Sequence, residues 1–446
     1  MRKCLRFIAV GALLAACGSG FDAFQRSALG SDGGIVAAPD AGAPPPSADA
    51  GTPADGGPQQ PGDTSCLARL LLSQLSRPLT LLVGADMDDS IAASAPFDVR
   101  YLYLAGGLAD GDGTCASCGA CTAAGASCSG SSGCDWWGCW QDPSVAPGQY
   151  VRDLLAKTAS RGMLPMISYY EVLQSSGVAE GPAEISALQN VQLTTRWFND
   201  FRFVLRQIGA TPALLHLEPD LWGYAEQMSP DPTAIPAAVT LANPLDCSGQ
   251  QDSFAGFGRC AISMVRKYAA NARVGLHASA WASGIDGTNN RDPSVDMVAN
   301  AQRVGDFLLA CGAADGDFVV VEASDRDAGY YRSLGVNTFW DADNATLPSF
   351  HQAFTWAAAL TERIGRPALW WQLPLGNMSL PDVPRQWQDN RVDYLFAHPD
   401  EVAKTNAFGM VFGAGDSQQT TPSTDGGNLV RKVLQFVPSR GQLVCP

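Results

Sequence analysis

The chain has 446 residues, of which 46% are apolar and 16% are charged, so it has the composition of a globular protein with a sizeable core. The formal charge is −15, and an acidic chain repels phosphate backbones, so we expect no nucleic-acid partner. Four histidines are too few for a histidine-rich multi-metal site, and we expect neither a metal nor a cofactor. Beyond the N-terminal leader, no apolar run approaches the roughly 18 residues of a membrane-spanning helix.

The first 16 residues have the order of an export signal: a basic start, a short apolar stretch, and then Leu14-Ala15-Ala16-Cys17. This order resembles a bacterial lipoprotein signal, which implies cleavage before Cys17 and lipidation of that cysteine. An ordinary secretory signal cut near Ala16 is the alternative, and either signal implies export. Gly18, in place of an Asp, implies an anchor in the outer membrane or at the cell surface. Residues 17–65 are rich in Ala, Pro, Gly and Asp and are expected to form a disordered tether.

Eleven cysteines follow Cys17, and export makes disulfides their expected state. Cys66 and Cys445 flank the folded region and could join its ends, while Cys247 and Cys260 could close a local loop. Six more crowd one Gly/Ser-rich segment: Cys115, Cys118, Cys121, Cys128, Cys134 and Cys139. We expect disulfides there as well, although the spacing of the first three also fits a zinc knuckle. Because eleven is odd, one thiol should stay free, and we choose Cys311, which lies in an apolar helical stretch.

Eight short apolar runs alternate with amphipathic stretches of helical length over residues 66–446. The predicted strands are 79–86, 99–106, 163–171, 213–218, 273–280, 317–324, 367–373 and 407–413. The predicted helices are 66–76, 149–161, 190–208, 253–271, 295–311, 349–365, 392–405 and 427–437, with a short segment near 88–96. Strands that alternate with helices indicate βαβ units and a parallel sheet. Eight such units predict a (β/α)8 TIM barrel that occupies residues 66–446 as one domain.

The extra length of the chain lies after predicted strands 2, 4 and 7, over residues 107–148, 219–252 and 374–391. Strand-to-helix loops build the active-site face of such barrels, so these insertions favour the barrel. A doubly wound open sheet is the alternative, but no Gly-x-Gly-x-x-Gly follows the first strand and no Walker loop occurs.

Polar residues stand at the predicted carboxyl ends of several strands. Strand 1 ends at Asp86, strand 3 at Glu171, and strand 6 at Glu322, while strand 4 carries His216, Glu218 and Asp220 and strand 5 carries His277. Because strand side chains alternate between faces, His216 and Glu218 are expected to point together into the barrel mouth. Trp370 and Trp371 should point to opposite faces, so one of them packs under the helices.

Acids combined with many tryptophans suit sugars, because sugars present CH faces to aromatic rings and hydroxyls to carboxylates. The tryptophans in question are Trp136, Trp137, Trp140, Trp222, Trp281, Trp340, Trp370 and Trp371. Glycoside hydrolysis uses one protonated carboxylic acid and a second carboxylate as nucleophile or base. A partly buried strand-end Glu among aromatic rings can acquire the raised pKa that the acid needs.

The segment LHLEPDLWGY, residues 215–224, resembles strand 4 of barrel glycoside hydrolases, and Glu218-Pro219-Asp220 resembles a motif of family-6 cellulases. The wider pattern over residues 100–282 is similar to a group of exported bacterial proteins of uncharacterised function. The large barrel clan with paired catalytic Glu residues has Asn before the strand-4 Glu and a second Glu on strand 7. Leu217 and Gln372 stand at those positions, so that clan's pair is not carried over.

We therefore predict a glycoside hydrolase that acts on an extracellular or envelope polysaccharide, with Glu218 as general acid. The second carboxylate is Glu322, our preference, or Asp86, Glu171 or Asp220. Substrate contacts are expected from the remaining aromatic and polar groups of this face: Asp220, Trp222, His216, His277, Trp281, Trp371, Gln372, Trp136 and Trp137. The alternative is a non-catalytic, glycan- or partner-binding lipoprotein that uses the same face. We expect a monomer attached to the membrane through the lipid on Cys17.

Overall fold

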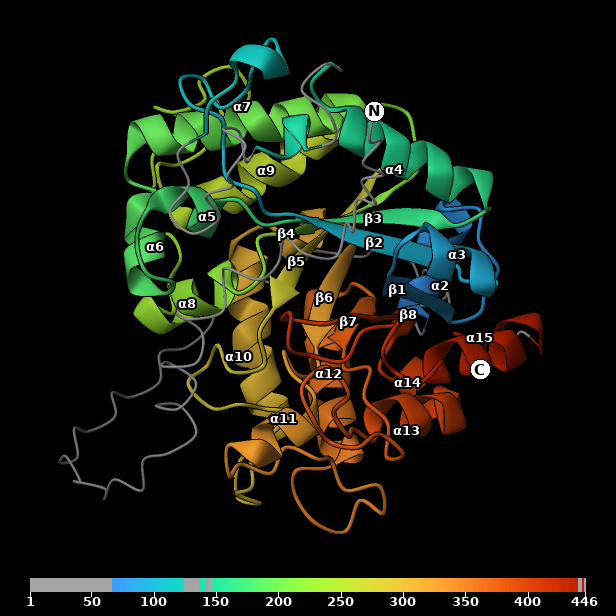
Figure 1. The fold of residues 1–446 in the computed structure, drawn as a ribbon. Helices are drawn as coiled ribbons and strands as arrows, with labels where there is room; N and C mark the ends of the chain where they lie inside the picture. Colours follow the sequence, from blue (N-terminus) through green and yellow to red (C-terminus); the bar gives the residue numbers. More distant parts are fainter. Residues whose placement is uncertain (1–65, 124–135, 141–145, 440–442, 445–446) are drawn as a thin grey trace, which may run out of the picture.

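The computed structural model describes residues 66–123, 136–140, 146–439 and 443–444, and its centre is a closed barrel of eight parallel strands (Figure 1). The strands are β1 (Leu82–Asp86), β2 (Val99–Leu104), β3 (Leu164–Tyr169), β4 (Leu214–Leu217), β5 (Arg273–Ala278), β6 (Phe318–Glu322), β7 (Ala368–Leu373) and β8 (Ala407–Phe412). Each strand pairs with its neighbours in chain order, and β1 closes the barrel by pairing with β8. The predicted fold class and all eight predicted strands are confirmed.

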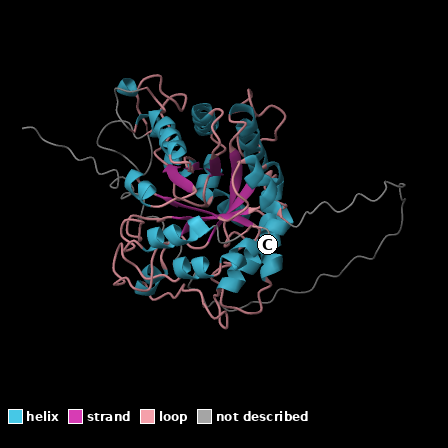
Figure 2. Ribbon diagram, turned by 90° about the vertical axis from the view of Figure 1, so that its right-hand side faces the viewer, coloured by secondary structure: helices cyan, strands magenta, loops and turns pink. Residues whose placement is uncertain are grey.

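Helices surround the barrel on its outer side (Figure 2). The longer ones are α2 (Leu67–Gln74), α4 (Gln149–Ser160), α7 (Val191–Ile208), α8 (Leu221–Met228), α9 (Phe254–Tyr268), α10 (Met297–Ala310), α12 (Phe350–Ile364) and α15 (Asn428–Ser439). The shorter ones are α3 (Asp89–Ser94), α5 (Val172–Ser176), α6 (Pro182–Ala187), α11 (Ala328–Ser333), α13 (Arg391–Ala397) and α14 (Pro399–Lys404). None of the described helices combines the length and apolar character of a membrane span.

Helix boundaries follow local chemistry. Asp88, Asn190 and Asp296 cap α3, α7 and α10 by accepting hydrogen bonds from backbone N–H groups of the first turn. The predicted helix 392–405 is divided into α13 and α14 at His398, because Pro399 has no N–H with which to continue a helix. The cap before α3 is Asp88 and not Asp86, which leaves the Asp86 carboxyl at the end of β1 without a capping role.

Side chains from non-adjacent strands meet inside the barrel. Trp371 on β7 contacts His216 on β4 and His277 on β5, with ring centroids 4.5 and 5.6 Å apart. The register places Tyr103, Ser168 and His216 side by side across β2, β3 and β4, so they share the inner face. Trp370 points to the outer face, where its indole N–H donates to the Thr405 hydroxyl at 3.2 Å. The prediction that the two tryptophans face opposite sides is confirmed.

Disulfides join Cys115 to Cys121, Cys118 to Cys139 and Cys247 to Cys260, and Cys311 is a buried free thiol. The local disulfide and the choice of free cysteine are confirmed, and the zinc-knuckle alternative is excluded because two of its thiols are joined to each other. Cys66 is also disulfide-bonded. The other cysteine predictions, Cys128, Cys134 and Cys445, lie outside the described residues, as do the signal, the tether and Cys17.

Candidate active site

Two carboxylates and one imidazole converge at the carboxyl end of the barrel. One ligand atom each of Asp220, His277 and Glu322 lies within 4.8 Å of the other two. Glu322 is the last residue of β6, and Asp220 follows β4 at the start of α8. We call Asp220 and Glu322 the acid pair. The Asp220 side chain is 16% exposed and Glu322 is partly exposed, so solvent reaches both carboxyl groups. The His277 side chain next to them is fully buried.

A hydrogen-bonded relay orients Glu322 through Gln372 on the neighbouring strand β7 and Tyr103 on β2, which does not neighbour β6 or β7. The Gln372 side-chain amide donates to Glu322 Oε1 at 2.8 Å, and the Tyr103 hydroxyl donates to the Gln372 amide oxygen. Because the tyrosine donates to the oxygen of the amide, the amide nitrogen is directed at Glu322. Gln372 therefore positions the carboxyl and is not a free substrate ligand.

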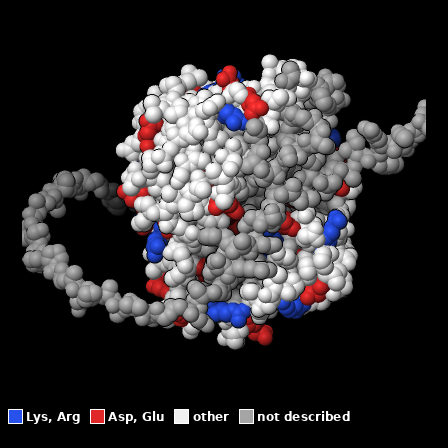
Figure 3. All heavy atoms as spheres, turned by 60° about the vertical axis from the view of Figure 1, so that its left-hand side comes forward, with Lys and Arg blue, Asp and Glu red and all other residues white. Residues whose placement is uncertain are grey.

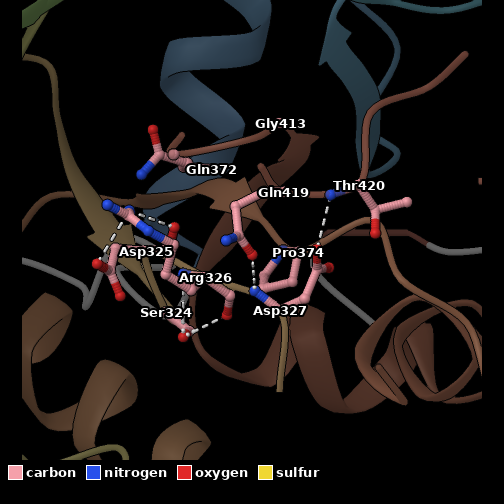
Figure 4. Close-up of a pocket in the computed structure, with 10 residues that line it drawn as sticks. Ser324, Asp325, Arg326, Asp327, Gln372, Pro374, Gly413, Gln419 and Thr420 are labelled. Carbon is pink, nitrogen blue, oxygen red and sulfur yellow. Dashed lines mark hydrogen bonds and ion pairs between the residues drawn. The ribbon is translucent and has the colours of Figure 1, made fainter. Parts of the chain in front are cut away.

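An ion pair lies beside the acid pair. Arg326 contacts the Asp325 carboxylate at 3.0 Å, and the Tyr331 hydroxyl donates to the same carboxylate at 2.6 Å. Figure 4 shows Asp325 and Arg326 together near Gln372, around a hollow of about 140 Å³. That space includes open solvent and encloses no room for a water molecule, so the hollow is a shallow recess and not a small-molecule cavity.

Burial and mutual repulsion raise the pKa values of the acids. Burial, and then the Asp220 and Asp325 charges, raise the pKa of Glu322 well above its usual range. Burial and the Asp325 charge raise the pKa of Asp220 to about 7, although Arg326 opposes the rise. The acids of the site are clustered, whereas the charged groups on the face drawn in Figure 3 are scattered, and acidic and basic side chains often lie side by side there. Burial and the neighbouring negative charges therefore favour the protonated form of Glu322.

A chain of polar side chains leads from the acid pair into the barrel. His277 Nδ1 lies 3.1 Å from His216 Nε2, and His216 Nδ1 lies 3.1 Å from the Ser168 hydroxyl. Burial lowers the pKa of both imidazoles, that of His277 to about 3, so both rings are neutral. His277 Nε2 lies 3.8 Å from Asp220 Oδ1 and has no hydrogen-bond partner among the described residues. His216 is thus an interior, hydrogen-bonded ring, and His277 is the histidine that borders the mouth.

Three non-glycine residues at the ends of β4 and β7 have backbones in the left-handed region: Glu218 with φ 44°, Asp220 with φ 65° and Gln372 with φ 50°. Such conformations cost on the order of 1–3 kcal/mol each and gather at functional sites. Two of the three belong to the acid pair and its relay. The third is Glu218, whose positive φ changes the direction of its own side chain.

The prediction that Glu218 points into the mouth beside His216 is wrong. Its positive φ turns the side chain outward, where the carboxylate accepts bonds from the Glu171 and Val172 N–H groups at 3.2–3.3 Å. The Trp197 indole of α7 donates to the same carboxylate at 2.5 Å. Because Glu218 is fully buried and fixes the start of α5, it is not placed to protonate a substrate.

Glu171 is also fully buried and outside the mouth, where one of its oxygens accepts from the Gly107 N–H at 2.9 Å. The expectation that Trp136 and Trp137 present sugar-binding surfaces is wrong as well. Both are fully buried, and their indole N–H groups donate to Asp200 of α7 at 2.5 and 2.9 Å. These residues attach the disulfide-linked loop to the barrel.

The other predicted contacts differ in exposure. Trp222 is buried against α9, and its N–H donates to the Leu217 carbonyl, so it is a packing residue and the prediction of a substrate contact is wrong. Trp371 is also buried, as part of the floor under the acid pair. Trp281 is partly exposed beside Tyr224, with ring centroids 4.7 Å apart, and remains a candidate platform. Asp86 is partly exposed, and burial raises its pKa to about 6.

Several residues that build the site were not predicted: Tyr103, Asp325 and Arg326 at the mouth, and Asp200 behind it. Tyr103 lies two residues after Tyr101 on β2, so by strand periodicity the two rings share one face, and both contact the inward ring of Trp371. Asp325 and Arg326 follow Glu322 by three and four residues. An acidic residue next to a basic residue just after a strand end could have marked them as candidate site residues. Asp200 lies within the helical pattern of α7, and nothing in the local sequence marks it.

No family model matches the chain, and no curated protein matches it. Among solved structures, an endo-β-1,4-mannanase double mutant from Cellulomonas fimi is 11% identical over 84% of this chain and 75% of its own, with a TM-score of 0.46. The GH113 β-mannanase AaManA from Alicyclobacillus acidocaldarius is 10% identical over 81% of this chain and 97% of its own, with a TM-score of 0.37.

The endoglucanase Cel6 from Mycobacterium tuberculosis is 14% identical over 50% of this chain, with a TM-score of 0.29, and the match spans 56% of its length. These neighbours are glycoside hydrolases, and at such identities and TM-scores they assign no activity to this chain. The chain has the (β/α)8 architecture, which rests on the closed sheet itself.

Proposed function

We propose that the protein is a glycoside hydrolase of the retaining type whose catalytic carboxylates are Glu322 and Asp220. The observation that carries the proposal is the approach of these two side chains, from β6 and from the loop after β4, to within 4.8 Å at the carboxyl end of the barrel. Retaining glycosidases hold their two carboxyl groups about 5–5.5 Å apart, whereas inverting enzymes need about 6.5–9.5 Å to admit a water. The spacing here supports the retaining mechanism.

In the first step, an Asp220 carboxylate oxygen attacks the anomeric carbon while protonated Glu322 gives its proton to the leaving glycosidic oxygen. The bond to the leaving sugar breaks and a glycosyl ester with Asp220 forms. In the second step, the Glu322 carboxylate takes a proton from a water that attacks the same carbon, which releases Asp220. Each residue returns to its starting protonation state, so the cycle balances.

Gln372 and Tyr103 serve as positioning residues in this proposal, because the amide donor directed at Glu322 fixes the carboxyl that gives the proton. Partly exposed Trp281 supports a sugar platform, because aromatic faces stack on the CH faces of pyranose rings. A carbohydrate polymer or oligosaccharide is therefore the proposed substrate. The leader sequence supports delivery of this activity to the cell envelope, with Cys17 as the lipid attachment point.

The test is hydrolysis of a polysaccharide panel, with products identified by mass spectrometry, by wild type, Glu322→Gln and Glu226→Gln. Loss of the acid should reduce turnover by about 10²–10⁴-fold. Glu226 is a matched control, because it is also buried but lies on α8 near Arg303, away from the mouth. Equal activity of Glu322→Gln and wild type would refute the assignment, and binding of one polymer without any product would indicate the non-catalytic alternative.

The role of Asp220 has a separate test. Asp220→Ala should be inactive, and azide should restore turnover by entering the space of the lost carboxylate. Because azide then attacks the anomeric carbon directly, the glycosyl azide should have the configuration opposite to that of the substrate. The wild type should give first products of unchanged configuration by proton NMR, and inverted wild-type products would contradict the retaining mechanism.

A further inference from the structure

We infer that Asp220, His277 and Glu322 form a binding site for a divalent transition-metal ion of the zinc type, and that an ion bound there blocks the carboxylate pair. The cation site stands on the geometry alone. Its inhibitory consequence rests on the proposed hydrolase function. The ligand set is one imidazole nitrogen and two carboxylate oxygens, drawn from three different strand ends of the barrel.

The distances suit a metal after a small contraction. Zinc binds imidazole nitrogen and carboxylate oxygen at about 2.0–2.2 Å, which places its ligands roughly 3.3 Å apart in a tetrahedron. His277 Nε2 and Asp220 Oδ1 are 3.8 Å apart, and all three ligand atoms lie within 4.8 Å. Asp220 is partly exposed, so its carboxylate can move inward and water can take the fourth position.

The second and independent observation is the unsatisfied nitrogen of His277. The side chain is fully buried, and Nε2 has no hydrogen-bond partner among the described residues. A buried polar atom without a partner is unfavourable, and such atoms call for a bound water or ion. Because this nitrogen borders the two carboxylates, a cation that contacts all three would satisfy it.

The surroundings of His277 favour the ligating form of the ring. If Nδ1–H donates to His216 Nε2 at 3.1 Å, and His216 Nδ1–H donates to the Ser168 hydroxyl, then the lone pair of His277 is on Nε2. Metal-binding histidines usually donate their other N–H in this way, which fixes the tautomer.

The charge and the donor types select the class of ion. Two carboxylates that repel each other in a partly buried site gain from a divalent cation between them. Imidazole suits zinc and similar transition metals, whereas calcium and magnesium take oxygen ligands. An ion that holds both carboxylates prevents one from attacking carbon and the other from carrying a proton, so zinc should compete with substrate.

The experiment is isothermal titration of Zn²⁺ into the metal-free, untagged protein. We expect one ion per chain with a micromolar Kd, and at least a tenfold weaker Kd for His277→Gln and for Asp220→Asn. Far-UV circular dichroism in chelator verifies folding. If the buried substitution His277→Gln causes misfolding, the zinc affinity of Asp220→Asn relative to wild type tests the site. The Asp220 side chain reaches solvent, so we expect that substitution to leave the fold intact.

A surface alternative supplies the matched control. His351 and His398 flank Glu401 at 3.4 and 3.6 Å and are exposed, so they could take zinc independently. His351→Ala should bind zinc like wild type. Loss of binding in His351→Ala, unchanged binding in His277→Gln and Asp220→Asn, or no binding at 1 mM would overturn the inference. Zinc binding by a protein that hydrolyses no polysaccharide would contradict only the proposed hydrolase function. Hydrolysis that zinc does not inhibit would contradict only the inference of an inhibitory zinc site.

Discussion

Asp200 offers the sharpest test of how the disulfide-linked loop is held. This fully buried carboxyl on α7 accepts bonds from the indoles of Trp136 and Trp137 and from the hydroxyl of Tyr169, the last at 2.5 Å. Asp200→Ala would leave three buried donors without an acceptor. At about 1–3 kcal/mol for each stranded donor, we expect a loss of about 4 kcal/mol in the free energy of unfolding at pH 4.5.

The loss should be smaller at neutral pH. Burial raises the pKa of Asp200 to about 6 in the folded protein, above its unfolded value of 3.8. As pH rises from about 4 to 6, the unfolded state ionises first, so the wild type loses stability that the alanine variant does not lose. This pKa shift lowers the unfolding free energy of the wild type by about 2 kcal/mol between pH 4.5 and pH 7.5. The wild type should therefore be more stable than Asp200→Ala by only about 2 kcal/mol at pH 7.5.

The assay is urea unfolding followed by circular dichroism at both pH values, with disulfides intact. Asp306→Ala is the control, because Asp306 forms an exposed ion pair with Arg363 that is worth about 0–1 kcal/mol. A loss for Asp200→Ala no greater than that of the control would refute the anchoring role. A loss that is equal at the two pH values would refute the raised pKa.

Three further predictions concern the relay, an ion-pair cluster and the leader. Tyr103→Phe should lower kcat about tenfold or more and shift the pH profile, because Gln372 loses the bond that orients it toward Glu322. Tyr101→Phe, which removes a hydroxyl without a partner among the described residues, should have little effect, and equal effects would contradict the relay. Asp246, despite burial, has its pKa lowered to about 2 by bonds from Lys267, Tyr268 and Arg202, so its stabilisation is present above about pH 4 and lost as pH falls toward 2. The stability gap between wild type and Asp246→Asn in urea should therefore narrow between pH 6 and pH 3, and a constant gap would count against this pairing. Cys17→Ser should abolish palmitate labelling of the protein in bacteria, whereas labelling of the variant would place the lipid elsewhere.

The alternation of strands and helices was readable from the sequence, because period-2 and period-3.6 apolar patterns are local properties of the chain. All eight strands, the insertions after β2, β4 and β7, the Cys247–Cys260 disulfide and the free Cys311 agree with the structure. The position of Glu322 at the end of a strand also followed from the sequence, because it closes the sixth apolar run.

The direction of side chains just past a strand end was decided only by the tertiary structure. One left-handed residue moved Glu218 from the mouth to the back of the barrel, because alternation no longer holds where φ changes sign. Asp220 became the partner of Glu322, and Trp136 and Trp137 became buried anchors on Asp200, more than 60 residues away. Contacts of that range depend on how α7 and the disulfide-linked loop pack on the barrel, and local sequence carries no record of that packing.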